Sequence, residues 1–176
     1  MILTTICRAI MGSSKAETLR ELLCVAFEAF KACDSFSEDS EAYAYLPNLA
    51  GVFDANAGKF EQALQYYLPA LEVRQKVDPI DYRHLCNSHN NVSEAYGALN
   101  RLDDALVAIE QGLALCELHY ENTSKWRDTR LLCMITAVAL HRLRNEPSAS
   151  LNLLDAAFAL IAEHKDADWD IEQVDA

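Results

Sequence analysis

The chain has 176 residues, of which 51% are hydrophobic and 24% charged, and its formal net charge is −12. This length supports one compact domain or one short repeat array with a sizeable apolar interior. The acidic balance argues against nucleic acid or an anionic membrane as a partner, since both need a basic protein surface. With only 5 Gly and 4 Pro, the composition suits a mostly helical chain with short turns.

The cysteine usage and the lack of a long apolar segment indicate the cellular compartment. Six cysteines occur without a CxxC pair or disulfide-like spacing, and most fall among apolar residues. We therefore expect small buried side chains in a reducing compartment. The apolar stretch 1–11 contains Arg8, is too short to span a membrane and lacks the features of a signal peptide. A cytoplasmic location is the expectation.

The first half of the chain shows apolar residues at helical spacing in four segments. The first predicted helix covers 15–33 and is followed by a polar break at 35–39. A helix over 41–57 is joined by Gly58-Lys59 to a helix over 60–77. Asp78-Pro79 is a helix-start signal, which predicts a fourth helix up to about residue 99. Pro47 is expected to mark a later helix start, and Pro69 to kink its helix.

The second half continues the same pattern of paired helices. Asn100-Arg101 predicts a turn before a fifth helix over 102–119, and a polar break at 121–124 precedes a sixth helix over 126–143. The seventh predicted helix covers 147–164. Connections of two or three residues inside each pair force the paired helices to be antiparallel. Strand-like alternation is absent from the sequence, so the expected fold is all-α.

The helix pairs repeat with a period of 42 residues. A period of this size indicates a stacked array, because one helix pair cannot bury its own apolar face. The matched positions in the first unit are Gly58, Phe60, Ala63, Leu64, Tyr67, Ala70, Leu71 and Val73. Their equivalents in the second unit are, in the same order, Asn100, Leu102, Ala105, Leu106, Ile109, Gly112, Leu113 and Leu115.

Two departures from the period carry structural expectations. A third unit is shifted by 44 residues relative to the second, rather than by 42. Ala149 then takes the place of Ala105, and Ala156 takes the place of Gly112. In the first helices of the first two units the shift is 43, which predicts one inserted residue between Phe53 and Gly58. Atypical terminal units are common in repeat arrays, because one face meets water.

The motif residues resemble those of the tetratricopeptide repeat (TPR) family, in its 42-residue kinesin-light-chain-like and MalT-like variety. They are Asn48-Leu49-Ala50, Phe53, residues 58–64, Tyr67, Ala70 and Leu71, then Asn91-Val92-Ser93, Tyr96, residues 101–106, Ile109, Gly112 and Leu113. The resemblance implies an α-solenoid of antiparallel helix pairs in a right-handed superhelix. Its expected parts are a partial helix pair at 1–38, repeats at 39–78 and 79–122, a degenerate repeat at 123–164 and an acidic tail at 165–176.

In this family the first helices of successive units line a concave groove that holds extended peptides. In kinesin light chains, Asn at the places of Asn48 and Asn91 contacts the cargo backbone; a side-chain amide can both donate to and accept from a peptide group. The alternative is that these asparagines bond only neighbouring helices or water. The resemblance places at or near the groove Asn48, Gly51, Asp54, Asn90, Asn91, Glu94, Met134, Ile135, Val138 and His141.

Other candidate sites are weaker. His84, Cys86 and His89 form an HxCxxH string, but residues 84 and 86 point in different directions on a helix and no second ligand cluster follows. We therefore predict neither a metal nor a cofactor, and the absence of catalytic motifs predicts no enzyme activity. Trp169 in the acidic tail is expected to cover the last helix pair; alternatively, the tail resembles the Trp-acidic peptides that kinesin light chains bind.

Together these features predict a non-catalytic interaction module whose groove binds an extended peptide or a partner helix. The alternative is a fragment of a larger regulator, such as the helical arm of a signalling ATPase or the cargo-binding arm of a motor adaptor. The beginning of the chain inside a repeat favours that alternative. Exposed end faces would also allow the solenoid to associate with itself.

Overall fold

The computed structural model describes residues 16–31, 41–121 and 123–164, which form helices and turns without a strand. The all-α prediction is confirmed. Stretch 1–11, the break at 35–39 and the tail with Trp169 lie outside the described residues. The helices are α2 (Ala16–Lys31), α3 (Glu41–Asn56), α4 (Phe60–Lys76), α5 (Tyr82–Ala98), α6 (Leu102–Leu118), α7 (Ser124–Leu143) and α8 (Pro147–His164).

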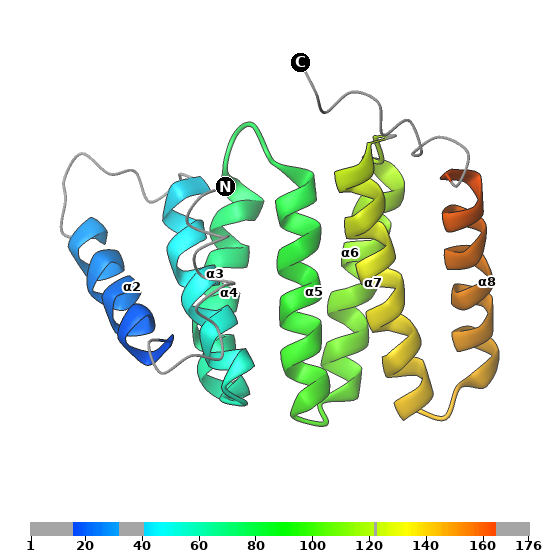
Figure 1. Cartoon of the computed structure of the whole chain (residues 1–176), viewed down its shortest axis with the longest axis horizontal. Helices are drawn as coiled ribbons and strands as arrows, with labels where there is room; N and C mark the ends of the chain where they lie inside the picture. The colour runs from blue at the N-terminus through cyan, green and yellow to red at the C-terminus, as the bar shows by residue number, and fades with distance from the viewer. Residues whose placement is uncertain (1–15, 32–40, 122, 165–176) are drawn as a thin grey trace, which may run out of the picture.

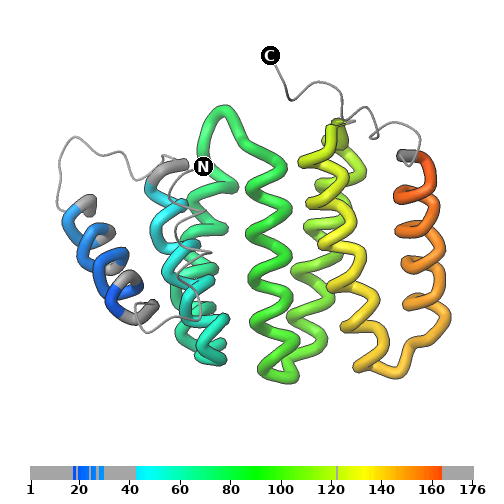
Figure 2. Tube along the Cα trace, in the orientation of Figure 1, coloured from blue at the N-terminus to red at the C-terminus, as the bar shows by residue number. Residues whose placement is uncertain are grey.

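The helices stand side by side in chain order, as Figure 1 shows. α3 packs on α4, α5 on α6 and α7 on α8, while α2 packs on α3, α4 on α5 and α6 on α7. The tube in Figure 2 shows the chain reversing direction at each turn. α5 also contacts α3 and α7, so the first helices of consecutive pairs are neighbours. Contacts between near neighbours alone build an α-solenoid, and we call the face formed by α3, α5 and α7 the inner face.

The turns inside the three pairs close in the same way. Gly58, Asn100 and Asn145 adopt left-handed φ angles of 74°, 59° and 60°. The next residue in each turn donates its N–H to a carbonyl five residues back, which satisfies the end of the first helix. These bonds are Lys59 N to Asp54 O (2.8 Å), Arg101 N to Tyr96 O (2.9 Å) and Glu146 N to His141 O (2.9 Å).

The spacing of the turns corrects the register expected from the sequence. Gly58 and Asn100 lie 42 residues apart with matching bonds in the preceding helix turn, so no residue is inserted before Gly58. Asn100 and Asn145 lie 45 residues apart, rather than the expected 44. In α8, Ala157 is buried and Ala156 is exposed, so Ala157 takes the place predicted for Ala156.

Helix α5 begins later than the sequence predicts. Its N-cap is Asp81, whose carboxylate accepts the N–H of His84 at 2.9 Å, and the helix starts at Tyr82. Asp78 and Pro79 belong to the preceding loop, where their peptide bond is cis. A capping carboxylate stabilises a helix by satisfying an unpaired N–H of the first turn, and Asp81 fills this role in place of the predicted Asp78.

The two proline expectations have different outcomes. Pro47 lies inside α3, which starts at Glu41, so it does not mark a helix start. Pro69 lies inside α4 on an exposed position, and the kink expected there stays a prediction. α7 begins at Ser124, two residues before the predicted start.

Small side chains let the helices approach closely. Tyr67 of α4 packs in a cluster with Ala63, Val92 and Ala95, which joins the first unit to α5. Gly51 of α3 faces the Tyr67 ring, and a Cβ there would stand 2.5 Å from its Cε1 atom. Such a contact cannot form without moving the ring, so the glycine fixes the distance between α3 and α4.

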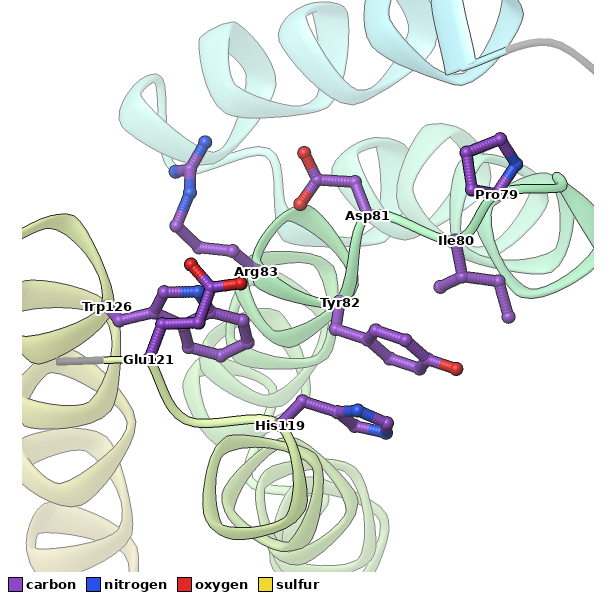
Figure 3. A pocket seen from close by; sticks show the side chains of 8 residues that line it. All are labelled: Pro79, Ile80, Asp81, Tyr82, Arg83, His119, Glu121 and Trp126. Atoms are coloured by element: carbon purple, nitrogen blue, oxygen red, sulfur yellow. The ribbon is translucent and has the colours of Figure 1, made fainter. Parts of the chain in front are cut away.

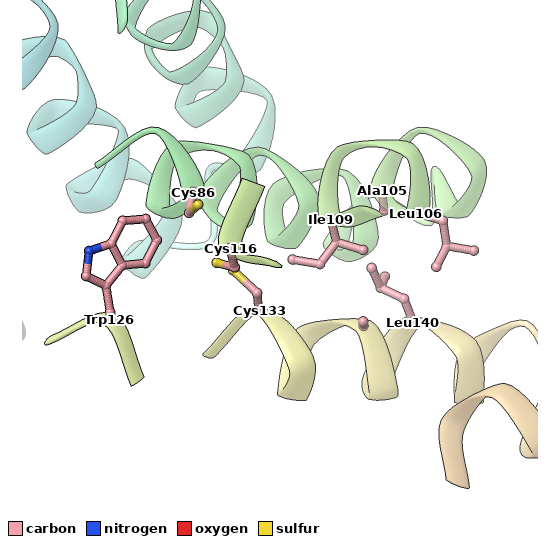
Figure 4. Close-up of a cluster of buried hydrophobic side chains, with 9 residues drawn as sticks. Cys86, Ala105, Leu106, Ile109, Cys116, Trp126, Cys133 and Leu140 are labelled. Carbon is pink, nitrogen blue, oxygen red and sulfur yellow. The ribbon is translucent and has the colours of Figure 1, made fainter. Parts of the chain in front are cut away.

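Three thiols meet where α5, α6 and α7 join. Cys86, Cys116 and Cys133 are free and fully buried, and Figure 4 shows them near Trp126 in one apolar cluster. The hydrogen bond to Cys116, together with burial, raises the pKa of the Cys86 and Cys133 thiols, so both stay protonated at neutral pH. The prediction of small buried side chains is confirmed for these three cysteines.

Candidate functional site

A row of polar side chains crosses the inner face. The Nδ2 group of Asn91 donates to Oδ1 of Asn48 at 3.1 Å, which joins α5 to α3. One helical turn further along α5, Oε1 of Glu94 accepts the hydroxyl of Thr136 at 3.3 Å, which joins α5 to α7. Asn48 and Asn91 are half-buried and Glu94 is exposed, so a ligand crossing the three helices can reach the row.

Two hollows flank Glu94. The smaller, of about 210 Å³, lies between α3 and α5 and also touches α4; it is lined by Val52, Ala55, Asn56, Phe60, Tyr67, Asn91, Glu94 and Ala95. The larger, of about 340 Å³, lies between α5 and α7 and is lined by Glu94, Gly97, Ala98, Ile135, Thr136, Ala139, Leu140 and Leu143. Because the larger hollow has no lining residue from α6 or α8, it opens on the inner face. Concave apolar surfaces with a few placed polar groups are the usual form of ligand sites.

The negative charges near the smaller hollow affect Tyr67. Burial, with the nearby charges of Glu94 and Asp54, raises the pKa of the Tyr67 phenol well above its ordinary value. The phenol therefore stays protonated and is a neutral part of the lining of this hollow.

Several predicted site residues lie beneath the surface of the inner face. Asn90 is 1% exposed; its Nδ2 group donates to Glu94 at 3.1 Å and helps to orient that carboxylate. Met134, Val138 and Gly51 are buried among packed side chains. These four residues support the groove wall, and the structure does not expose them to a ligand.

Asp54 has a different structural role. Its side chain is fully buried, and Oδ2 accepts Nη2 of Arg20 at 3.0 Å. This ion pair ties α2 to α3, so Asp54 anchors the leading helix and is not displayed in the groove. His141 is half-buried at the end of α7, where its Nδ1 atom lies 2.7 Å from Oε2 of Glu146.

The sequence reasoning missed part of the larger hollow. Thr136, Ala139 and Leu143 line it beside the predicted Ile135. The signal was present as a stripe at positions 135, 139 and 143, which share one face of a helix because they are four residues apart.

The HxCxxH string does not form a site. Cys86 points into the apolar cluster, while His89 is buried, and that burial lowers the pKa of its imidazole. His84 lies near Asp81 at the start of α5. Across residues 16–31, 41–121 and 123–164, no three His, Cys, Asp or Glu side chains are placed to hold a metal ion.

A hollow of about 610 Å³ lies at the loop ends of the second and third pairs (Figure 3). Its walls are the α4–α5 and α6–α7 connections, where the rings of Tyr82 and His119 stack with centroids 3.4 Å apart. Asp81 on its rim already caps α5. The hollow therefore marks the joint between two loops, and the inner face is the stronger candidate site.

Residues 40–117 match the family model of the tetratricopeptide repeat. These residues are tetratricopeptide repeats. The TPR fold extends beyond them: the chain is similar to BtubC (BKLC) from P. vanneervenii, with 21% identity and a TM-score of 0.79 over 90% of this chain and 61% of that chain. It is also similar to a putative kinesin light chain from Podosopora anserina with nearly identical TPR-like repeats. Two structures of that protein give 12% and 13% identity and TM-scores of 0.73 and 0.72, over 90% of this chain and 73% of theirs.

At these identities the likeness shows the fold, and the predicted α-solenoid of TPR type is confirmed. The chain spans 61% of the length of BtubC. No relative was found among curated protein sequences. TPR arrays present extended concave surfaces for binding, so the repeats give this chain the architecture of a protein–protein interaction scaffold. Of the helices described, none is long and apolar enough to cross a membrane.

Proposed function

We propose that this chain is a non-catalytic TPR module that binds an extended protein segment across α3, α5 and α7. The observation that carries the proposal is the half-buried pair formed by Asn48 and Asn91. Their bond uses one side-chain oxygen and one side-chain N–H, and neither side chain has another hydrogen-bond partner among the described residues. The NH₂ group of Asn48 and the Oδ1 atom of Asn91 therefore remain for the backbone of a ligand.

The proposed ligand runs across the helices and places side chains in the two hollows beside Glu94. Main-chain hydrogen bonds would supply affinity, and the hollows would select the side chains. Because the contact surface is modest, we expect dissociation constants around micromolar. The free, buried thiols support a cytoplasmic location as part of this proposal.

Affinity capture from a native lysate tests the proposal. The groove variant is Asn48→Ala with Asn91→Ala, and the control is Gln62→Ala with Gln65→Ala, two exposed amides on α4. We expect a partner that the wild type and the control retain and the groove variant loses. Far-UV circular dichroism checks that each variant is folded. Equal capture by all three proteins would place binding on another face.

A second candidate is that these repeats form part of a larger regulator, and the outer face of α8 favours it. Three apolar side chains there are 43–65% exposed; they are Leu151, Phe158 and Ile161. Their counterparts 45 residues earlier pack in clusters with α7 residues; they are Leu106, Leu113 and Cys116. A further helix of a longer chain would cover this face as α7 covers α6. An open reading frame that continues with more TPR units would support this candidate.

A further inference from the structure

The hollow between α5 and α7 is lined mainly by apolar side chains, and two of the large ones are exposed to solvent. Ile135 is 59% exposed and Leu143 is 64% exposed, and both line it. Exposed Ala98 and Ala139 lie beside them. Large apolar side chains that gather in a concave site usually mark a place where another apolar group binds. This hollow is wide enough, at about 340 Å³, for a large side chain.

The hollow has one charged group on its rim, the carboxylate of Glu94. Its Oε1 atom accepts from Nδ2 of Asn90 at 3.1 Å and from the hydroxyl of Thr136 at 3.3 Å. Both partners are neutral, so they orient the carboxylate without cancelling its charge. Its Oε2 atom has no hydrogen-bond partner within the described part of the chain. An oriented carboxylate with a free oxygen binds cationic donors most strongly.

Two neighbouring charged residues, Asp54 and Arg142, do not line this hollow. Asp54 is neutralised by Arg20 below the surface. Arg142 is exposed at the far end of α7, beside Ala139 and Leu143. A ligand with a cation on one side of its apolar residue therefore fits in one direction, with the cation towards Glu94. The net charge of −12 adds long-range attraction for a basic segment.

We propose that the groove selects a cationic–apolar protein segment. A large apolar side chain of the ligand enters the hollow between α5 and α7, and a neighbouring Lys or Arg binds the Glu94 carboxylate. The inference rests on the proposed groove function and names its ligand chemistry.

Selection from a random 12-residue peptide library displayed on phage tests this inference. The bait is the full chain, and synthetic copies of the enriched peptides are then titrated against variants by fluorescence polarisation. Glu94→Gln keeps an oxygen for Asn90 and Thr136 and removes the charge. Glu110→Gln makes the same change on an exposed position of α6 and serves as the matched control. Ile135→Ser with Leu143→Ser tests the hollow at two exposed sites.

We expect enriched peptides to carry Lys or Arg close to a large apolar residue. Glu94→Gln should weaken their binding about fivefold to tenfold at low salt, as expected for the loss of an ion pair of about 1 kcal/mol or slightly more, whereas Glu110→Gln should leave it unchanged. The double serine variant should also lose binding. Added salt should reduce the difference between wild type and Glu94→Gln.

Two contrary results are distinguishable. Acidic or uncharged peptides that still need Asn48 and Asn91 would overturn the cationic–apolar inference and leave groove binding intact. Peptides whose binding ignores Asn48, Asn91 and Glu94, or a library that yields no binder dependent on them, would overturn both the inference and the proposed function.

Discussion

Gly51 lies at a close approach between α3 and α4. A Cβ there would stand 2.5 Å and 2.6 Å from two atoms of the Tyr67 ring and 3.2 Å from the carbonyl oxygen of Ala63. Gly97 also faces a close neighbour, Cδ2 of Leu140 at 2.8 Å, but that atom is the end of a flexible side chain. The same substitution therefore meets a rigid ring at one site and a movable methyl at the other.

Gly51→Ala should lower the free energy of unfolding by about 1–3 kcal/mol, because it overpacks the contact with Tyr67. Gly97→Ala should cost less than about 1 kcal/mol, since Leu140 can move and alanine is the better helix former. Urea denaturation followed by circular dichroism measures both. Equal losses for the two variants would contradict the role given to the Tyr67 ring.

Single-residue roles were predictable where they depend on sequence neighbours. The small residue at Gly112 and the buried cysteines follow from helical spacing, whereas Gly51 was expected at the groove and is buried. The pairing of Asp54 with Arg20 could not be predicted from helical spacing, because 34 residues separate them and no local pattern links two such charges. Asp54 was therefore expected at the groove, whereas the structure uses it to hold α2.

At the scale of elements, the three turns inside the pairs share one backbone conformation. Gly58 adopts its φ of 74° without strain, because it has no side chain. Asn100 and Asn145 reach 59° and 60°, which asparagine tolerates better than other residues with a Cβ. Each turn thus sets where its second helix begins.

Asn100→Ala should destabilise the chain by about 1–2 kcal/mol, because alanine at a left-handed φ strains the turn. Asn100→Gly should be neutral to within a few tenths of a kcal/mol or slightly stabilising. Asn152→Ala, on an exposed position inside α8, is the matched control and should not destabilise. Thermal unfolding of the three variants gives the comparison, and equal effects of Ala at 100 and 152 would argue against the strain.

The periodicity of apolar residues predicted that each helix exists. It did not decide where α5 begins or which residues of α8 face α7. Asp78 and Asp81 both suit a helix cap, and hydrogen bonding in the structure selects Asp81. In α8, Ala156 and Ala157 are adjacent and identical, so composition could not show which one faces α7. The turn at Asn145 decides the register.

At the scale of the whole molecule, α8, the last helix described, has exposed apolar side chains on its outer face. On α8, Leu151 is 58% exposed and Phe158 is 65% exposed. The equivalent positions of α6 are covered by α7, the helix that follows it. Unless a partner covers this face, it favours stacking with a second copy of the chain.

Sedimentation velocity should therefore show concentration-dependent association of the wild type. Leu151→Gln with Phe158→Gln should shift the chain towards monomer. The control is Val107→Gln with Leu118→Gln, which removes apolar side chains of α6 that are at least about as exposed and should leave association unchanged. A wild type that stays monomeric at high concentration would rule out this end face as a self-association surface.

The buried thiols give the molecule an intrinsic reporter. The interface between the second and third helix pairs, called the seam here, contains Cys86, Cys116 and Cys133, and each of them is fully buried. An alkylating reagent can reach them only while that seam is open, so their labelling rate measures how often the middle of the array separates. Ligand binding across α5 and α7 would lower the labelling rate, so this rate would report whether the groove is occupied without a fluorescent probe on the protein.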